Sequence, residues 1–111
     1  MVGRIVEDEQ LQQALDYLRD SAAETGQARG RLVAAQYRVK RVEAVLFLGS
    51  EAKTVDAKKM EVRLNASYTA ATDEEAEAAA AFEVLRSQRE AAIYRIEAWR
   101  TEQANYRGLK A

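Results

Sequence analysis

The sequence predicts an all-α protein, built as a long antiparallel helical hairpin that resembles a coiled coil, with a short helical connecting segment. Three observations support this fold. The 111-residue chain contains no proline, and good helix formers (Ala, Leu, Glu, Gln, Arg, Lys) dominate its composition. Charged residues make up 32% of it and aromatic residues 7%, which suits long solvated helices. In both halves, apolar residues recur at alternating steps of three and four.

The first helix is expected over residues of about 8–49, with the Asp8 side chain capping its first amides. Its steps alternate regularly except for an additional step of three between Thr25 and Ala28, a stammer that overwinds a supercoil locally. Gly26 and Gly30 lie beside it, so either a bend near residues 25–30 or close helix packing is expected. The predicted apolar seam comprises Leu11, Leu15, Leu18, Ala22, Thr25, Ala28, Leu32, Ala35, Val39, Val42 and Leu46.

The connecting segment covers residues of about 50–71, after Gly49 and Ser50 end the first helix. Within it, residues 60–64 alternate in polarity as a strand does, whereas Val55, Lys59 and Val62 share one helical face. A single strand has no pairing partner elsewhere in the chain. We therefore predict a short helix over residues 52–64.

The second helix is expected over residues of about 73–107. Thr72 and Glu75 have the spacing of a capping box, and Gly108 is a typical C-terminal cap. A helix of about 35 residues spans ~52 Å. Antiparallel pairing of the two helices then makes residues 1–111 a single domain. The predicted seam comprises Ala78, Phe82, Leu85, Arg89, Ala92, Ile96, Trp99, Gln103 and Tyr106.

Apolar residues outside both seams predict further association into a homo-oligomer. A two-helix hairpin leaves them in water, and exposed apolar patches commonly mark an interface. Arg89 is a polar seam residue, which either fixes the register or extends its charged end to solvent. The off-seam residues are Val33, Tyr37, Val45, Leu48, Val84, Ile93 and Tyr94. The seam residues expected to take part in oligomerisation are Phe82, Leu85, Arg89, Ile96 and Trp99.

The composition argues against catalysis, a metal site or a cofactor. The chain has no cysteine and no histidine, so it lacks thiol nucleophiles and the commonest general base and metal ligand. Asp73 and Glu77 lie four residues apart, but helix-start electrostatics explain them better than a shared metal. No apolar run approaches the ~20 residues that span a bilayer, and no export signal is recognisable. A cytoplasmic protein that is not an enzyme and has no membrane partner is expected.

The net charge of −1 conceals a basic middle third. Residues 26–63 carry nine basic and four acidic side chains, a net charge of +5, whereas residues 1–25 and 64–111 carry net charges of −4 and −2. Several cations along one surface are what phosphate binding needs, and Tyr37 is placed to stack on a base. A solvated charged face is the alternative. The candidate nucleic-acid-binding residues are Arg31, Arg38, Arg41, Lys53, Lys58, Lys59 and Arg63.

Three segments resemble a family of small helical proteins encoded by tailed bacteriophages: residues 37–50, the turn at residues 65–68, and the ending at residues 96–105, with its Glu-x-Trp-Arg-x-x-x-Ala-Asn pattern. The layout is also similar to that of the recombination mediators of T-even phages. The resemblance implies an oligomer that binds single-stranded DNA through Lys58 and Lys59, with Lys53 and Arg63 beside them. It further implies a recombinase or a single-strand-binding protein as a partner, in the cytoplasm of a bacterial host.

Two functional hypotheses follow. The first is a phage-type recombination mediator, a helical homo-oligomer that binds single-stranded DNA and helps load a recombinase. The second is a protein-only interaction module, such as a phage inhibitor of a host defence complex or an assembly factor. In the second case the acidic helix ends are the working surface.

Overall fold

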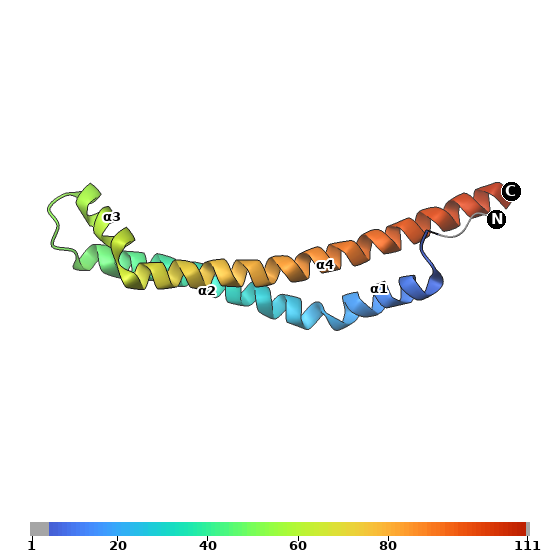
Figure 1. Ribbon diagram of the computed structural model, residues 1–111, viewed down its shortest axis with the longest axis horizontal. Helices are drawn as coiled ribbons and strands as arrows, with labels where there is room; N and C mark the ends of the chain where they lie inside the picture. Colours follow the sequence, from blue (N-terminus) through green and yellow to red (C-terminus); the bar gives the residue numbers. More distant parts are fainter. Residues whose placement is uncertain (1–4, 111) are drawn as a thin grey trace. The chain divides into compact units, whose positions relative to one another are not determined.

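The structure, a computed structural model, describes residues 5–110, and this part of the chain consists of four α-helices without a strand (Figure 1). They are α1 (Asp8–Asp20), α2 (Ala22–Gly49), α3 (Val55–Leu64) and α4 (Ala66–Lys110). The predicted all-α class is confirmed. The helical prediction for the segment before residue 65 is also confirmed, although α3 begins at Val55 rather than at residue 52.

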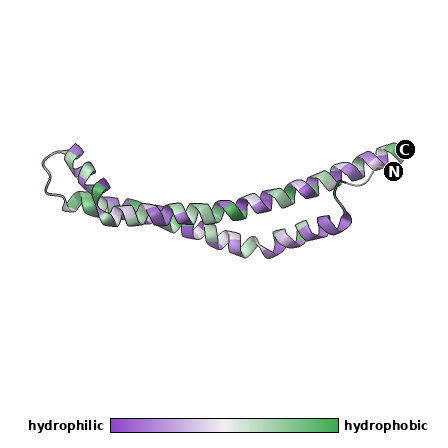
Figure 2. Cartoon of the chain, viewed as in Figure 1, coloured by the Kyte–Doolittle hydropathy of each residue, from purple (hydrophilic) through white to green (hydrophobic). Residues whose placement is uncertain are grey.

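The chain divides into two compact units. The first unit combines residues up to Thr25 with residues from Val84 onward, and the second unit comprises Gly26–Glu83. Both α2 and α4 contribute residues to both units. Hydrophobic residues occur along both helices, and several lie where α2 ends and α3 follows (Figure 2).

The first helix begins with a capping box that the sequence analysis missed. Glu7 is the N-cap residue of α1, its side chain accepts from the backbone of Gln10, and the Gln10 side chain accepts from the Glu7 amide at 2.9 Å. Asp8, predicted as the cap, is instead the first helical residue, so that prediction is wrong. Its carboxylate and that of Glu9 lie in the first turn, where negative charge interacts favourably with the positive end of the helix dipole.

The predicted first helix is interrupted, but at Ser21 rather than near residues 25–30. Ser21 ends α1, and its carbonyl accepts from both the amide and the hydroxyl of Thr25, at 2.9 and 2.7 Å. Gly26 and Gly30 lie inside α2, and a Cβ at either position would meet no atom within 4 Å. Neither a break at the glycines nor a close packing that requires glycine is present.

Burial corrects the seam of the first half of the chain. Leu15 is 44% exposed and Ala22 is exposed, whereas Ala14 and Ser21 are buried at 3% and 5%. Replacing Leu15 and Ala22 by these two residues makes the steps alternate between three and four throughout, so the predicted stammer is absent. The buried or half-buried series is Leu11, Ala14, Leu18, Ser21, Thr25, Ala28, Leu32, Ala35, Val39, Val42 and Leu46.

The last helix is longer than predicted at both ends. Asn65 begins it, because its side-chain oxygen accepts from the Ser67 amide at 2.8 Å. Thr72 lies inside α4 and its hydroxyl donates to the Thr69 carbonyl, so the predicted capping box is wrong and the connecting segment ends before residue 66. Gly108 is helical without a positive φ, so the predicted C-terminal cap there is wrong as well.

The predicted seam of α4 is confirmed up to Gln103. Each predicted residue from Ala78 to Gln103 is buried or half-buried, and the same alternation extends back to Ala71 and Glu75. Tyr106, the last predicted residue, is 54% exposed. A 3.5-residue repeat of burial therefore runs along α4 between residues 71 and 103.

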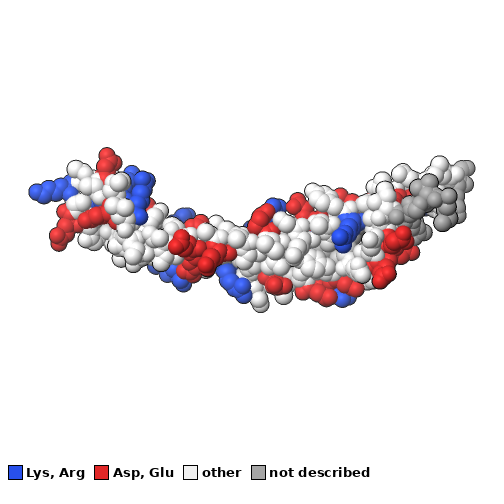
Figure 3. Space-filling model, in the orientation of Figure 1, with Lys and Arg blue, Asp and Glu red and all other residues white. Residues whose placement is uncertain are grey.

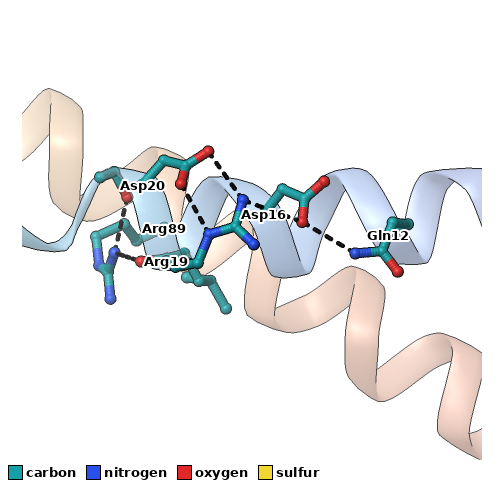
Figure 4. A network of polar contacts seen from close by, with 7 residues as sticks. Gln12, Asp16, Arg19, Asp20 and Arg89 are labelled. Carbon is teal, nitrogen blue, oxygen red and sulfur yellow. Dashed lines mark hydrogen bonds and ion pairs between the residues drawn. The ribbon is translucent and has the colours of Figure 1, made fainter.

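Side-chain contacts in the first unit connect α1 with α4. Arg89 donates from Nη1 to the Leu18 carbonyl and to the Ser21 hydroxyl, both at 2.7 Å (Figure 4). The Tyr17 hydroxyl donates to the Gln88 side chain at 2.7 Å, and Nε1 of Trp99 donates to Asp8 at 3.0 Å. In the second unit, Arg38 on α2 forms an ion pair with Glu74 on α4 at 2.8 Å.

Candidate nucleic-acid interface

The four cations predicted for the connecting segment lie in the second unit, at its α2–α3 end. Lys53 belongs to the loop between α2 and α3, whereas Lys58, Lys59 and Arg63 lie on α3 itself. Lys58 is half-buried and the other three are exposed. Cationic and anionic side chains both occur at this end on the face drawn in Figure 3.

Two short polar side chains shape the loop that carries these cations. Ser50, at the end of α2, donates from its hydroxyl to Glu61 on α3 and accepts from the Ala52 amide at 3.2 Å. Thr54 caps α3, because its hydroxyl oxygen accepts from the Ala57 amide at 3.1 Å. The Ser50–Glu61 contact joins the residue after α2 to the second half of α3, and the Thr54 cap begins α3 locally.

An aromatic ring orients one of the lysines. The Lys58 ammonium lies 5.3 Å from the centroid of the Phe47 ring, within the range of a cation–π contact. A similar contact occurs on α2, where Lys40 lies 5.8 Å from the ring centroid of Tyr37. Aromatic and cationic groups are therefore adjacent at two places in the second unit.

A hollow of about 200 Å³ opens beside these cations, between α2, α3 and α4. Lys59 and Arg63, four residues apart on one face of α3, line it, while Val62 closes it as a buried apolar wall. Two aromatic rings and one carboxylate complete the lining, from Phe47, Tyr68 and Glu43. A second hollow, of about 410 Å³, adjoins it and shares Glu43, Phe47 and Lys59.

Among the cations of the second unit, only Arg38 forms an ion pair with a carboxylate of residues 5–110. In the described part of the chain, residues 5–110, none of Lys53, Lys58, Lys59 and Arg63 forms an ion pair with a carboxylate. Arg38 is neutralised by Glu74. The structure therefore brings three of the predicted cations together on α3, with Lys53 on the loop that leads to it.

The other predicted arginines lie along α2 rather than at its end. Arg31 and Arg41 are exposed, on the same helix as Arg38. The part of α4 in the same unit, residues 66–83, has five acidic residues and no basic one. The positive charge of α2 is thus partly balanced inside its own unit.

The residues predicted to take part in oligomerisation are half-buried within a single chain: Phe82, Leu85, Arg89, Ile96 and Trp99. Arg89 hydrogen-bonds to α1 of its own chain, and so does Trp99. Most of the predicted off-seam apolar residues are much more exposed. Leu48 is 82% exposed and Val45 is 64% exposed.

Sequence reasoning missed three residues of the hollow, namely Glu43, Phe47 and Tyr68. Glu43 and Phe47 are four residues apart, so they share a face of α2, and this spacing was available in the sequence. That Tyr68 joins them depends on where α4 begins. A helix that begins at about residue 73, as predicted, leaves Tyr68 without a helical face.

Comparison with known protein families, with curated proteins and with solved structures finds no significant match to this chain. Over residues 5–110, no three His, Cys, Asp or Glu side chains come close enough together to hold a metal ion. None of the helices in this described range is both long and apolar enough to cross a membrane.

Proposed function

We propose that this chain is a recombination mediator of the phage type, a helical homo-oligomer that binds single-stranded DNA and helps load a recombinase. The observation that supports this most is a group of four cations at the α2–α3 end that form no ion pair with a carboxylate of residues 5–110, defined here as the cationic end: Lys53, Lys58, Lys59 and Arg63. A cation that is already paired with a carboxylate must give up that partner to bind a phosphate. An unpaired cation can neutralise a phosphate without losing a partner, and the counterion released from the DNA then favours binding.

The role is one of binding rather than catalysis, in the cytoplasm of a bacterial host. Phosphate contacts carry no sequence information, so the cationic end is expected to bind single strands without strong sequence preference. The four cations lie on α3 and the loop before it, whereas the acidic residues between 73 and 77 lie on α4. The recombinase and the single-strand-binding protein are the partners that the layout of the sequence implies.

An antiparallel coiled-coil hairpin is the arrangement we propose for the helices. Burial at steps of three and four along α2 and α4 supports it. The pairing of Asp8 with Trp99 and of Tyr17 with Gln88, in opposite chain order, supports it for α1 and α4. Exposed apolar side chains such as Leu48 and Leu64, at 82% and 79%, support further association between copies. Light scattering at micromolar concentration is expected to give a mass above the 12.4 kDa of one chain.

The DNA-binding proposal is tested by fluorescence anisotropy with single- and double-stranded oligonucleotides at two salt concentrations. We expect the single strand to bind more tightly, and the double variant Lys58→Ala/Lys59→Ala to weaken binding equally for different sequences. Each lost phosphate contact makes the negative slope of log affinity against log salt shallower by about 0.7. The double variant is therefore expected to make it shallower by about 1.4.

The matched control is Arg100→Ala/Arg107→Ala, which removes the same charge from exposed positions on α4 in the first unit. It is expected to retain nearly all of the affinity and the salt slope. Equal losses in the two double variants would show that net charge, and not the cationic end, determines binding. No binding by the wild-type protein at ~50 mM salt, where phosphate contacts are strong, would refute the proposal.

A protein-only interaction module is the second candidate, favoured by the acidic stretch of α4. Asp73, Glu74 and Glu77 are exposed there, with no basic residue between 66 and 83. A surface of this kind suits a basic partner and competes with nucleic acid for it. This candidate predicts no oligonucleotide binding and full retention of partner binding in the Lys58→Ala/Lys59→Ala variant.

A further inference from the structure

We propose that the hollow beside α3 holds one unstacked base of the bound strand and favours bases that carry an amino group. This inference rests on the function proposed above and adds to it a contact with the base, beyond the phosphates. The residues that carry it are the lining residues of the hollow, Glu43, Phe47, Lys59, Val62, Arg63 and Tyr68, all within the second unit.

The size of the hollow limits it to a small ligand. At about 200 Å³ it is smaller than the ~300–1,000 Å³ of pockets that take drug-sized molecules. Phe47 and Tyr68, both half-buried, contribute aromatic surface from α2 and α4. Base–aromatic stacking is the usual way in which proteins hold unstacked bases, because every base has a π-face.

The charges around the hollow match the two ends of a nucleotide. Lys59 and Arg63 lie on its α3 side, both exposed and without an ion pair in the described residues, where they are available to a phosphate. Glu43 lies on the α2 side, and an ionised carboxylate only accepts hydrogen bonds. A carboxylate pairs well with the exocyclic amino group of cytosine, and uracil and thymine present a carbonyl oxygen at that position instead.

A duplex does not present a base in this way, because its bases are stacked and paired. Extruding one costs unstacking and unpairing energy, and this cost is smallest in a strand that is already single. The hollow thus gives a physical reason for single strands to bind more tightly than duplexes. The adjoining hollow of about 410 Å³ shares Glu43, Phe47 and Lys59 and is also lined by Lys40 and Leu48.

The test compares three single strands of equal length and phosphate number: oligo(dC), oligo(dU) and an abasic strand. Fluorescence anisotropy with the wild-type protein is expected to rank oligo(dC) first and the abasic strand last. Because one stacked base contributes appreciably, the difference between oligo(dC) and the abasic strand is expected to be about fivefold or more in affinity. Oligo(dC) and oligo(dU) both carry pyrimidine rings that can stack, so a difference in affinity between them reports the effect of the amino group.

Two variants locate the effect. Phe47→Leu keeps an apolar side chain but removes the ring, and is expected to weaken binding of oligo(dC) more than binding of the abasic strand, which is affected only through the contact of the ring with Lys58. Tyr94→Leu is its matched control, because Tyr94 is an exposed ring on α4 in the first unit and lines neither hollow. Glu43→Gln replaces a pure acceptor by an amide that also donates, and is expected to abolish the preference for oligo(dC) over oligo(dU).

The outcomes separate this inference from the function on which it rests. Equal binding of all three strands by the wild-type protein, or equal effects of Phe47→Leu and Tyr94→Leu, would overturn the base site and leave DNA binding intact. Unchanged preference in Glu43→Gln would also overturn it. Failure of every strand to bind would overturn both proposals. Circular dichroism of each variant establishes that the helices are retained.

Discussion

The two units of the chain use polar side chains in different ways. In the first unit, Arg89 donates to the Leu18 carbonyl and to the buried Ser21 hydroxyl, so a charged group lies within the packed stripe of α4. In the second unit, the buried residues are small or apolar, as at Ala28, Ala35 and Val62.

This difference has a consequence for function. A polar group inside a helix pair selects one register, because every other register leaves it without partners. In the first unit, polar groups are used in this way to specify the fold. In the second unit we expect size and shape to select the register, and Lys53, Lys59 and Arg63 at the α2–α3 end are exposed to a ligand.

The largest expected effect concerns Arg89 in the first unit. Arg89→Ala removes two hydrogen bonds from a charged donor and leaves the buried Ser21 hydroxyl without that partner. Hydrogen bonds to charged groups contribute about 1.5–3 kcal/mol, so we expect the free energy of unfolding to fall by about 2–3 kcal/mol. Chemical denaturation followed by circular dichroism measures it.

The matched control for this change is Arg95→Ala, an exposed arginine on the same helix. It is expected to change the free energy of unfolding by no more than about 0.5 kcal/mol. A double-mutant cycle with Ser21→Ala isolates the pair. Additive effects of Arg89→Ala and Ser21→Ala would show that the two residues are not coupled, and the contrast between the units would be lost.

The next largest effect tests shape selection in the second unit. Ala35 is 3% exposed whereas its neighbour Ala34 is exposed, although both lie on α2. Ala35→Leu forces additional volume into a packed position and is expected to cost about 1–3 kcal/mol. Ala34→Leu is expected to stay within about 0.5 kcal/mol of the wild type. Thermal or chemical denaturation that ranks them in the opposite order would show that the seam runs elsewhere.

A smaller effect is expected for the ion pair of Arg38 with Glu74. Its side chains are 57% and 47% exposed, so solvent and salt screen the attraction. The coupling energy from a double-mutant cycle is expected to lie below about 1 kcal/mol and to decrease at high salt. A coupling as large as that between Arg89 and Ser21 would mean that polar contacts specify both units alike.

The smallest effect concerns a surface contact of the first unit, between Arg19 and Asp20 (Figure 4). The hydrogen bond from Arg19, at 2.9 Å, holds the pKa of the Asp20 carboxyl below its usual value. The folded state therefore favours the carboxylate. The small contribution of this contact to stability is present at pH values above the pKa of Asp20 in the unfolded state. It is lost as the pH falls through the lower pKa of Asp20 in the folded state. Titration by NMR is expected to give a higher pKa for Asp20 in Arg19→Gln than in the wild type.

Local sequence determined the helices of both units and the buried seam of α4. The helical class and the seam of α4 from Ala78 to Gln103 follow from composition and spacing, because a helix is built from contacts between near neighbours. Phe82, Leu85, Ile96 and Trp99 are all half-buried in that seam. The cationic character of the α2–α3 end was likewise present in the sequence.

Tertiary structure decided the positions where two local choices had nearly equal energy. Asn65 and Thr72 are both good N-cap residues, and capping contributes only about 1 kcal/mol. The structure has α4 begin at Asn65, where the packed α3 ends. Ala14 and Ser21 are weaker seam candidates than Leu15 and Ala22 by hydrophobicity, yet they are buried, because Arg89 of α4 supplies Ser21 with a partner. The hollow of Glu43, Phe47 and Tyr68 has the same origin. It exists only where three helices meet, and no local spacing along the sequence encodes that meeting.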